Sequence, residues 1–215
     1  NASLSAELLR DAVVARCREA ARAEGEARSV DLDAVADTLS AWDGRFELGS
    51  VGATLWREVM AGFPVADWRA GGTLFAEPFD PEDAVATPRG LAAAPDAGPD
   101  PVVAAVVQAV AVLTAAGLAL DDPLGAVQWA QRGEHRVPVH GGGEGDGVAN
   151  VLAPVGSLSS HSLEPGPTRL APVADRGGRT GLAEGGYRVT YGTSFVMAVE
   201  LTHDGPKGAG LLAYG

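Results

Sequence analysis

Residues 186–215 read GYRVTYGTSFVMAVELTHDGPKGAGLLAYG, and this stretch decides the fold class. Apolar residues alternate well enough over Tyr187–Tyr191 and Ser194–His203 to predict two strands. Asp204-Gly205 predicts a turn, and the apolar run Leu211–Gly215 predicts a terminal strand. An apolar strand with nothing after it is an unusual end for a domain. We therefore expect the chain to be one piece of a larger protein.

Upstream of the strands, the apolar residues recur with helical spacing. We expect one helix from Ser5, a second from about Asp31, and a third from Ser50 to about Gly62. Ser5 and Ser50 are the predicted N-caps of their helices. The inward-facing positions expected in these helices are Leu8, Leu9, Ala12, Val13, Cys17, Leu32, Val35, Ala36, Leu39, Leu55, Trp56 and Val59.

Later segments are assigned from their proline, glycine and apolar content. Residues 64–100 are rich in Pro, Gly and acids, which predicts a connection without a long helix. A fourth helix is expected over about 100–116 and ends at Gly117; this Ala-rich run predicts a buried helix rather than a membrane span. Residues 1–63 are thus helical, 64–100 a connection, 101–120 a helix and 121–215 strands and loops. This is a mixed α+β class with a helical first half and antiparallel strands in the second.

The segment after the fourth helix predicts short strands and one long loop. Val127–Arg132 and Arg136–His140 can form a hairpin around Gly133-Glu134, and Ala149–Leu152 a further strand. Residues 154–186 are rich in Gly, Pro and Ser, which predicts a surface excursion.

The composition excludes several classes of function. Sixteen basic and 28 acidic residues give a net charge of −12, which argues against nucleic acid or an anionic membrane as the main partner. Cys17 is the only cysteine, so no internal disulfide is possible. No nucleotide fingerprint, redox motif or spaced metal ligands occur, so we expect no cofactor and no metal.

The most site-like local feature is the run HGGGEGDG at residues 140–147. Its glycines can admit a ligand to the backbone or serve a tight chain reversal, and the second interpretation is favoured. A cation site of His140, Glu144 and Asp146 is the less favoured alternative. Serines surround His161, but no Gly-x-Ser-x-Gly elbow accompanies them, which favours a solvated loop. Trp42, Trp56, Trp68 and Trp129 are core candidates first and acyl-pocket candidates second.

Several blocks, taken in order, resemble the penicillin-acylase family in its branch of aculeacin-type and acyl-homoserine-lactone acylases. The blocks are SAELL (5–9), LSAWDG (39–44), SVGATLW (50–56), PFDP (78–81), TPRGL (87–91), PLGAVQ (123–128), VPVHGG (137–142), GVAN (147–150), YGTSF (191–195) and GLLAYG (210–215). Their shared order covers nearly the whole chain. The resemblance places residues 1–215 in the later part of the family's large β subunit.

This resemblance implies a fold and a chemistry. The fold is the four-layer αββα sandwich of N-terminal-nucleophile hydrolases, with residues 194–200 and 211–215 as central strands. The activity is hydrolysis of an N-acyl amide in a lipopeptide, an acyl-homoserine lactone or a β-lactam side chain. The precursor cuts itself, and the new N-terminal Ser attacks the amide. That Ser lies on a segment outside this chain, so no residue here is assigned a catalytic role.

The resemblance also implies partners and a location. The partners are the α subunit and the remaining β-subunit segments of the same precursor, together with a hydrophobic acyl substrate. The location is secreted or periplasmic. Trp42, His140 and Asn150 are the candidates for positions near the substrate cleft. Two other interpretations stay open: a non-catalytic acidic α+β binding module, and an acylase homologue without activity.

Overall fold

The computed structural model describes residues 1–24, 30–63, 74–155, 180–193 and 195–212. Its helices are α1 Leu4–Glu24, α2 Leu32–Ala41, α3 Ala53–Ala61, α5 Pro101–Ala115 and α6 Leu124–Val127, with 3-10 turns η2 Pro81–Asp83 and η3 Glu144–Asp146. Its strands are β1 Phe75–Glu77, β2 Arg89–Leu91, β3 Gln128–Arg132, β4 His135–Pro138, β5 Leu152–Pro154, β6 Tyr187–Gly192, β7 Phe195–Thr202 and β8 Gly205–Leu212. The α+β class is confirmed.

Side-chain caps fix where α2 and α5 begin. The Asp31 carboxylate accepts from Ala34 N, and the Asp100 carboxylate accepts from Val102 N at 2.8 Å. Both helices begin where the sequence predicts them, since an Asp at this position satisfies an N–H that has no partner within the helix. No helix in the described residues combines the length and the apolar character that a bilayer crossing needs.

The predicted caps of α1 and α3 are wrong. Ser3, not Ser5, accepts from Ala6 N at 3.2 Å, so α1 begins at Leu4. Helix α3 begins at Ala53 after Gly52, and the Ser50 hydroxyl accepts instead from Glu47 N. Gly52 has φ of +97°, and a Cβ there would lie 3.0 Å from Trp42 Cβ. Because Gly52 packs closely on Trp42 in a left-handed conformation, the helix begins only at the next residue, Ala53.

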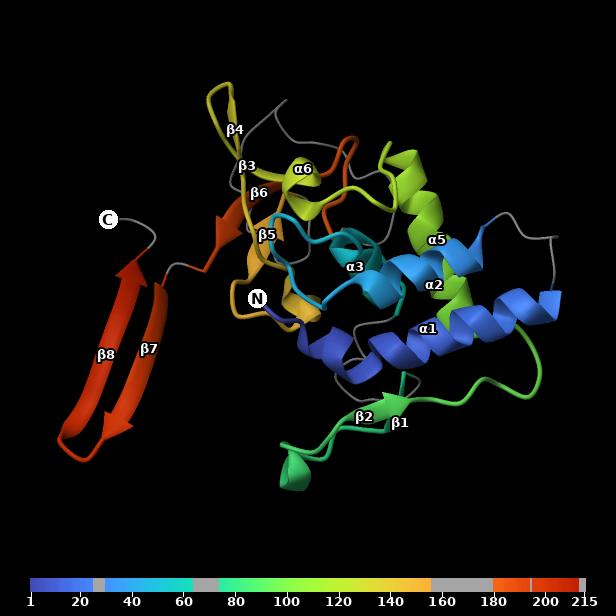
Figure 1. Ribbon diagram of the computed structural model, residues 1–215, viewed down its shortest axis with the longest axis horizontal. Coiled ribbons are helices and arrows are strands. Elements are labelled where there is room, and N and C mark those ends of the chain that lie inside the picture. Colours follow the sequence, from blue (N-terminus) through green and yellow to red (C-terminus); the bar gives the residue numbers. More distant parts are fainter. Residues whose placement is uncertain (25–29, 64–73, 156–179, 194, 213–215) are drawn as a thin grey trace.

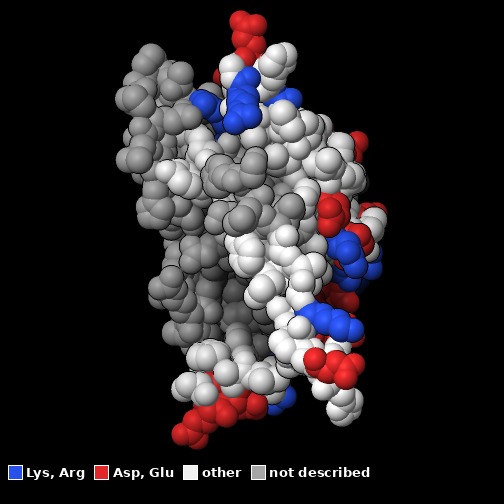
Figure 2. Space-filling model, turned by 90° about the vertical axis from the view of Figure 1, so that its left-hand side faces the viewer, with Lys and Arg blue, Asp and Glu red and all other residues white. Residues whose placement is uncertain are grey.

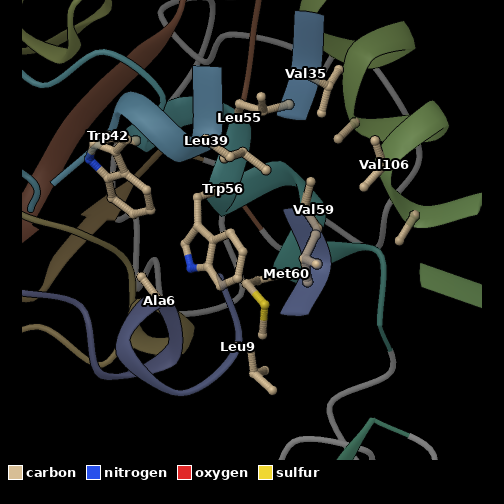
Figure 3. Close-up of a cluster of buried hydrophobic side chains, with 14 of the residues drawn as sticks. Ala6, Leu9, Val35, Leu39, Trp42, Leu55, Trp56, Val59, Met60 and Val106 are labelled. Atoms are coloured by element: carbon tan, nitrogen blue, oxygen red, sulfur yellow. The ribbon is translucent and has the colours of Figure 1, made fainter. Parts of the chain in front are cut away.

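The four longer helices enclose one apolar core (Figure 3). Leu9, Leu39, Trp56 and Val106 are at most 1% exposed, and the picture shows Trp56 in the middle of the cluster. Cys17 is buried, as predicted. Leu8 and Ala12 are only partly covered, because the buried face of α1 runs through Leu9, Val13 and Val14.

The segment predicted as an irregular connection contains a small sheet. Strands β1 and β2 pair antiparallel, with Phe75 opposite Leu91 and Glu77 opposite Arg89. Each is three residues long and the prolines stand between or beyond them, which is why no alternation revealed them. Residues 64–73, with Trp68, lie outside the described part.

A four-stranded sheet of order β4-β3-β6-β5 carries the loops of interest. The β3–β4 hairpin around Gly133-Glu134 is confirmed. Strand β3 pairs parallel with β6, so the expectation of antiparallel strands is wrong for this pair. The pairs β3–β4, β5–β6 and β7–β8 are antiparallel, as expected. The strand predicted over Ala149–Leu152 lies two to three residues later, at Leu152–Pro154. The predicted excursion over 154–186 falls largely on residues 156–179, outside the described part.

Strands β7 and β8 form a hairpin that projects from the body (Figure 1). Eight residues of each strand pair, from Phe195 opposite Leu212 to Thr202 opposite Gly205, so β8 begins well before the predicted Leu211. The sequence concealed this beginning because Gly-Pro-Lys-Gly-Ala-Gly has low β propensity. In the described residues the two strands form a sheet of their own and are not central in a larger one.

Candidate functional site

Trp42 is a core residue, and one side of it also lines a surface hollow. Its side chain is 3% exposed, and its Nε1 donates to Arg45 O at 2.7 Å. Its ring contacts Phe46 edge-on at 5.6 Å between centroids. An open hollow of about 430 Å³ beside it is lined by Thr38, Ala41, Trp42, Asp43, Glu47, Gly49, Ser50 and Val51. The residue is thus a core tryptophan whose neighbours form a surface depression.

His140 and Asn150 lie together, and Asn1 joins them. Asn150 Nδ2 donates to His140 O at 2.8 Å, and Asn150 N donates to Asn1 Oδ1 at 3.2 Å. Asn1 Nδ2 lies 2.7 Å from His140 Nδ1, and 3.5 Å from Glu47 Oε1. We call Asn1, Glu47, His140 and Asn150 the histidine cluster. Glu47 also lines the hollow beside Trp42, so the three sequence candidates belong to one surface region.

The glycines of the HGGG run serve chain packing, as the favoured interpretation predicted. Gly141 has φ of +120°, and a Cβ there would lie 2.5 Å from Asn150 O. A Cβ at Gly142 would lie 2.8 Å from Asp146 Oδ2. These positions need glycine because backbone and a buried carboxylate approach too closely for any side chain. The described residues contain no group of three His, Cys, Asp or Glu side chains that could hold a metal ion.

A buried ionic network lies beneath the histidine cluster. Arg57 donates from Nε to Asp146 Oδ2 at 3.1 Å, from Nη1 to Gln128 Oε1 at 2.8 Å and from Nη2 to Gly141 O at 3.2 Å. Gln128 Nε2 donates to Gly141 O at 3.0 Å, and Gly143 N donates to Asp146 Oδ2 at 2.6 Å. Helix α3, strand β3 and the loop 141–146 are thereby tied together.

The network is almost completely buried, and this burial raises the pKa values of its acidic groups. Arg57 is 4%, Gln128 0% and Asp146 2% exposed. Burial raises the pKa of Asp146, while Arg57 and the Gly143 N–H act to lower it. Burial, and then the carboxylate of Glu58, raise the pKa of Tyr187 well above 10. The Tyr187 hydroxyl donates to Glu58 Oε1 at 2.7 Å, and the Arg57 guanidinium lies 4.6 Å from the Tyr187 ring centre.

Sequence reasoning missed Arg57, Gln128 and Tyr187 and considered Asp146 only as a possible cation ligand. Arg57 and Asp146 are 89 positions apart, and no local pattern marks such a pair. The only signal available was Asp146 within the glycine run, where a carboxylate can receive backbone N–H groups. His161 and its neighbouring serines lie outside the described residues.

The comparisons with known proteins place this arrangement in a family. The family model of penicillin amidase matches residues 1–215. The chain belongs to the penicillin amidase family. It is 34% identical over 211 residues to aculeacin-A acylase of Actinoplanes utahensis, covering 97% of this chain and 22% of that protein. It is 30% identical to the acyl-homoserine lactone acylase PvdQ of Pseudomonas syringae pv. syringae (strain B728a) over 179 residues, covering 82% of this chain and 19% of that protein.

The names and lengths of these relatives limit what family membership says about function. Both are acylases by name, which supports acyl-amide hydrolysis at the level of the family. The chain spans only 22% and 19% of their respective lengths.

Proposed function

We propose that this chain is part of an amidohydrolase that cleaves an N-acyl amide. The observation that carries the proposal is the family match over residues 1–215 together with 34% identity to an acylase. The substrate class is a lipopeptide, an acyl-homoserine lactone or a β-lactam side chain with a hydrophobic acyl group. The substrates in the names of the two relatives favour the first two.

The nucleophile of the proposed reaction is an N-terminal Ser on another segment of the same precursor. Its own α-amine, with a pKa near 7.7–8.0 in model peptides, suits the role of general base at neutral pH. The hydroxyl adds to the amide carbonyl, the amine leaves with a proton, and water then releases the acid from the acyl-enzyme. Residues of this chain provide scaffold and cleft wall, with the histidine cluster and the hollow beside Trp42 as the wall.

Packing supports the proposed partners. Phe195, Met197, Val199 and Leu201 of β7 are 48–85% exposed, which is unusual for four apolar side chains on one strand. Figure 2, from the side on which the hairpin projects, shows a largely uncharged described surface with charges toward its edges. We infer that other β-subunit segments and the α subunit cover this hairpin and complete an αββα sandwich. An exported location, secreted or periplasmic, is part of the same proposal.

The test is denaturing intact-mass analysis of the native assembly, with N-terminal sequencing of every chain. A co-purifying chain that begins with Ser, and release of fatty acid from an acyl amide, are the expected results. A single 21.8 kDa species without hydrolytic activity would overturn the proposal and favour a binding module.

A further inference from the structure

The hydrogen bonds of Asn1 determine which way its amide faces. Asn150 N is a backbone donor, and it lies 3.2 Å from Asn1 Oδ1. A backbone N–H cannot accept, so the atom opposite it must be the amide oxygen. The Asn1 NH₂ group then faces His140 Nδ1 at 2.7 Å. Because an amide NH₂ only donates, His140 Nδ1 must accept and carries no proton.

The neutral imidazole of His140 therefore carries its proton on Nε2. This ring is exposed, and Nε2 has no hydrogen-bond partner in the described part of the chain. A histidine whose one nitrogen is held as an acceptor presents the other as a donor of fixed identity. On the exposed surface of the histidine cluster, the Nε2–H of His140 is thus a donor for a ligand.

The backbone of residues 140 and 141 is fixed by several hydrogen bonds. Gly141 O accepts from Arg57 Nη2 and Gln128 Nε2, and Gly141 N donates to Phe46 O at 2.9 Å. Asn150 Nδ2 holds His140 O at 2.8 Å. An exposed side chain on so constrained a backbone is pre-organised for a ligand, since little orientation remains to be lost on binding.

The charge around the cluster selects the kind of ligand. Glu47 Oε1 lies 3.5 Å from Asn1 Nδ2 on the same surface. This carboxylate, which also lies 3.4 Å from Asn1 N, disfavours an anionic ligand on the surface of the histidine cluster but does not repel a neutral carbonyl oxygen. We propose that His140 Nε2 donates a hydrogen bond to a neutral carbonyl oxygen in the leaving group of the acyl substrate, such as a lactone or peptide carbonyl. This role rests on the proposed function.

The experiment compares two substrates of the full-length enzyme with the same acyl chain. One is an acyl-homoserine lactone, and the other an acyl anilide without a leaving-group carbonyl. His140→Ala should raise KM for the lactone about 3- to 10-fold relative to the anilide, the effect of one lost neutral hydrogen bond. His140→Gln, whose amide N–H can reach the place of Nε2, should recover most of this selectivity, and His140→Asn should not.

Controls separate this role from a structural one and from the proposed function. His135→Ala removes another exposed histidine, on β4, and should leave the selectivity unchanged. The ring ¹⁵N shifts of His140 should show an unprotonated Nδ1, independently of activity. A protonated Nδ1, or equal KM changes for both substrates, would overturn the inference alone. If the wild-type enzyme hydrolyses neither these two substrates nor an acylated lipopeptide or β-lactam, the proposed function is overturned and this role with it.

Discussion

Arg57 occupies a position on α3 from which a single side chain reaches three segments. A buried pair such as Arg57–Asp146 adds little net stability over apolar residues of the same volume, but loss of one partner strands the other charge. We infer that the pair specifies one arrangement of the loop 141–146, because Arg57 also binds Gln128 and Gly141. In the sequence, an arginine in an amphipathic helix indicates a solvated face, and only the tertiary contact with residue 146 shows otherwise.

Replacement of Arg57 by Met should make stability strongly pH-dependent. Without Arg57, the pKa of Asp146 rises further, because burial already raises it and Arg57 opposes that rise. An acid with a raised folded pKa stabilises the fold below its unfolded pKa, near 3.9, and this stability is lost as pH rises through the folded pKa. The loss should reach about 3–5 kcal/mol at pH 7 and be smaller at pH 5.

Denaturant unfolding of the full-length protein at both pH values measures this effect. In Arg57→Met/Asp146→Asn the buried carboxylate is gone, so the difference between pH 5 and pH 7 should fall to that of the wild type or below it, since of these two proteins only the wild type keeps Asp146 with its raised pKa. If Arg57→Met loses the same free energy of unfolding at both pH values, Asp146 does not change its protonation state between pH 5 and pH 7, and the prediction is wrong.

Gly141 tests whether the glycine run is required for packing. Gly141→Ala should destabilise the protein by about 1–3 kcal/mol or more, because its φ of +120° strains an L-residue and its Cβ would meet Asn150 O at 2.5 Å. Gly133→Ala is the matched control: φ is +59° and nothing lies within 4 Å, so only about 1 kcal/mol is expected. Thermal melting of both variants compares them, and equal losses would contradict the packing explanation.

At the scale of elements, the caps explain why some helices were predictable. Asp31 and Asp100 directly precede their helices and hold backbone N–H groups, so the local sequence suffices. Ser3 and Ser5 are both plausible caps, and distant contacts separate them: Ser3 Oγ donates to Asp146 O at 2.6 Å, whereas Ser5 Oγ accepts from Trp56 Nε1 at 2.9 Å. The same limit applies to β6, whose parallel pairing with β3 spans an undescribed segment.

The two aspartate caps should differ in their contributions. Asp31→Ala loses one exposed cap, and about 1 kcal/mol is expected. Asp100→Ala should cost more, because Asp100 Oδ2 also accepts from Arg16 Nη1 at 2.8 Å in a partly buried pair. Asp100→Asn keeps an acceptor for Val102 N and should fall between the two. Melting temperatures of the three variants rank the losses, and an Asp100→Ala loss no larger than that of Asp31→Ala would contradict this order.

At the scale of the whole molecule, the β7–β8 hairpin decides whether this chain can exist alone. Phe195, Met197, Val199 and Leu201 share one face of β7, because side chains alternate along a strand. A sheet of two strands has no core of its own and is marginal in water. Exposed apolar faces with free strand edges associate with other chains.

The 215 residues expressed alone should therefore self-associate, as light scattering after size-exclusion chromatography would measure. Met197→Lys/Leu201→Lys, on the apolar face, should reduce this association, and in the full-length protein it should lower the melting temperature. Ala198→Lys/Glu200→Lys places two lysines on the opposite face and should do less of both, although it adds one unit more of positive charge, since the partner segments are expected to cover the apolar face. Wild-type residues 1–215 that stay monomeric and melt cooperatively would contradict the expectation, because the hairpin would then be stable without partner segments.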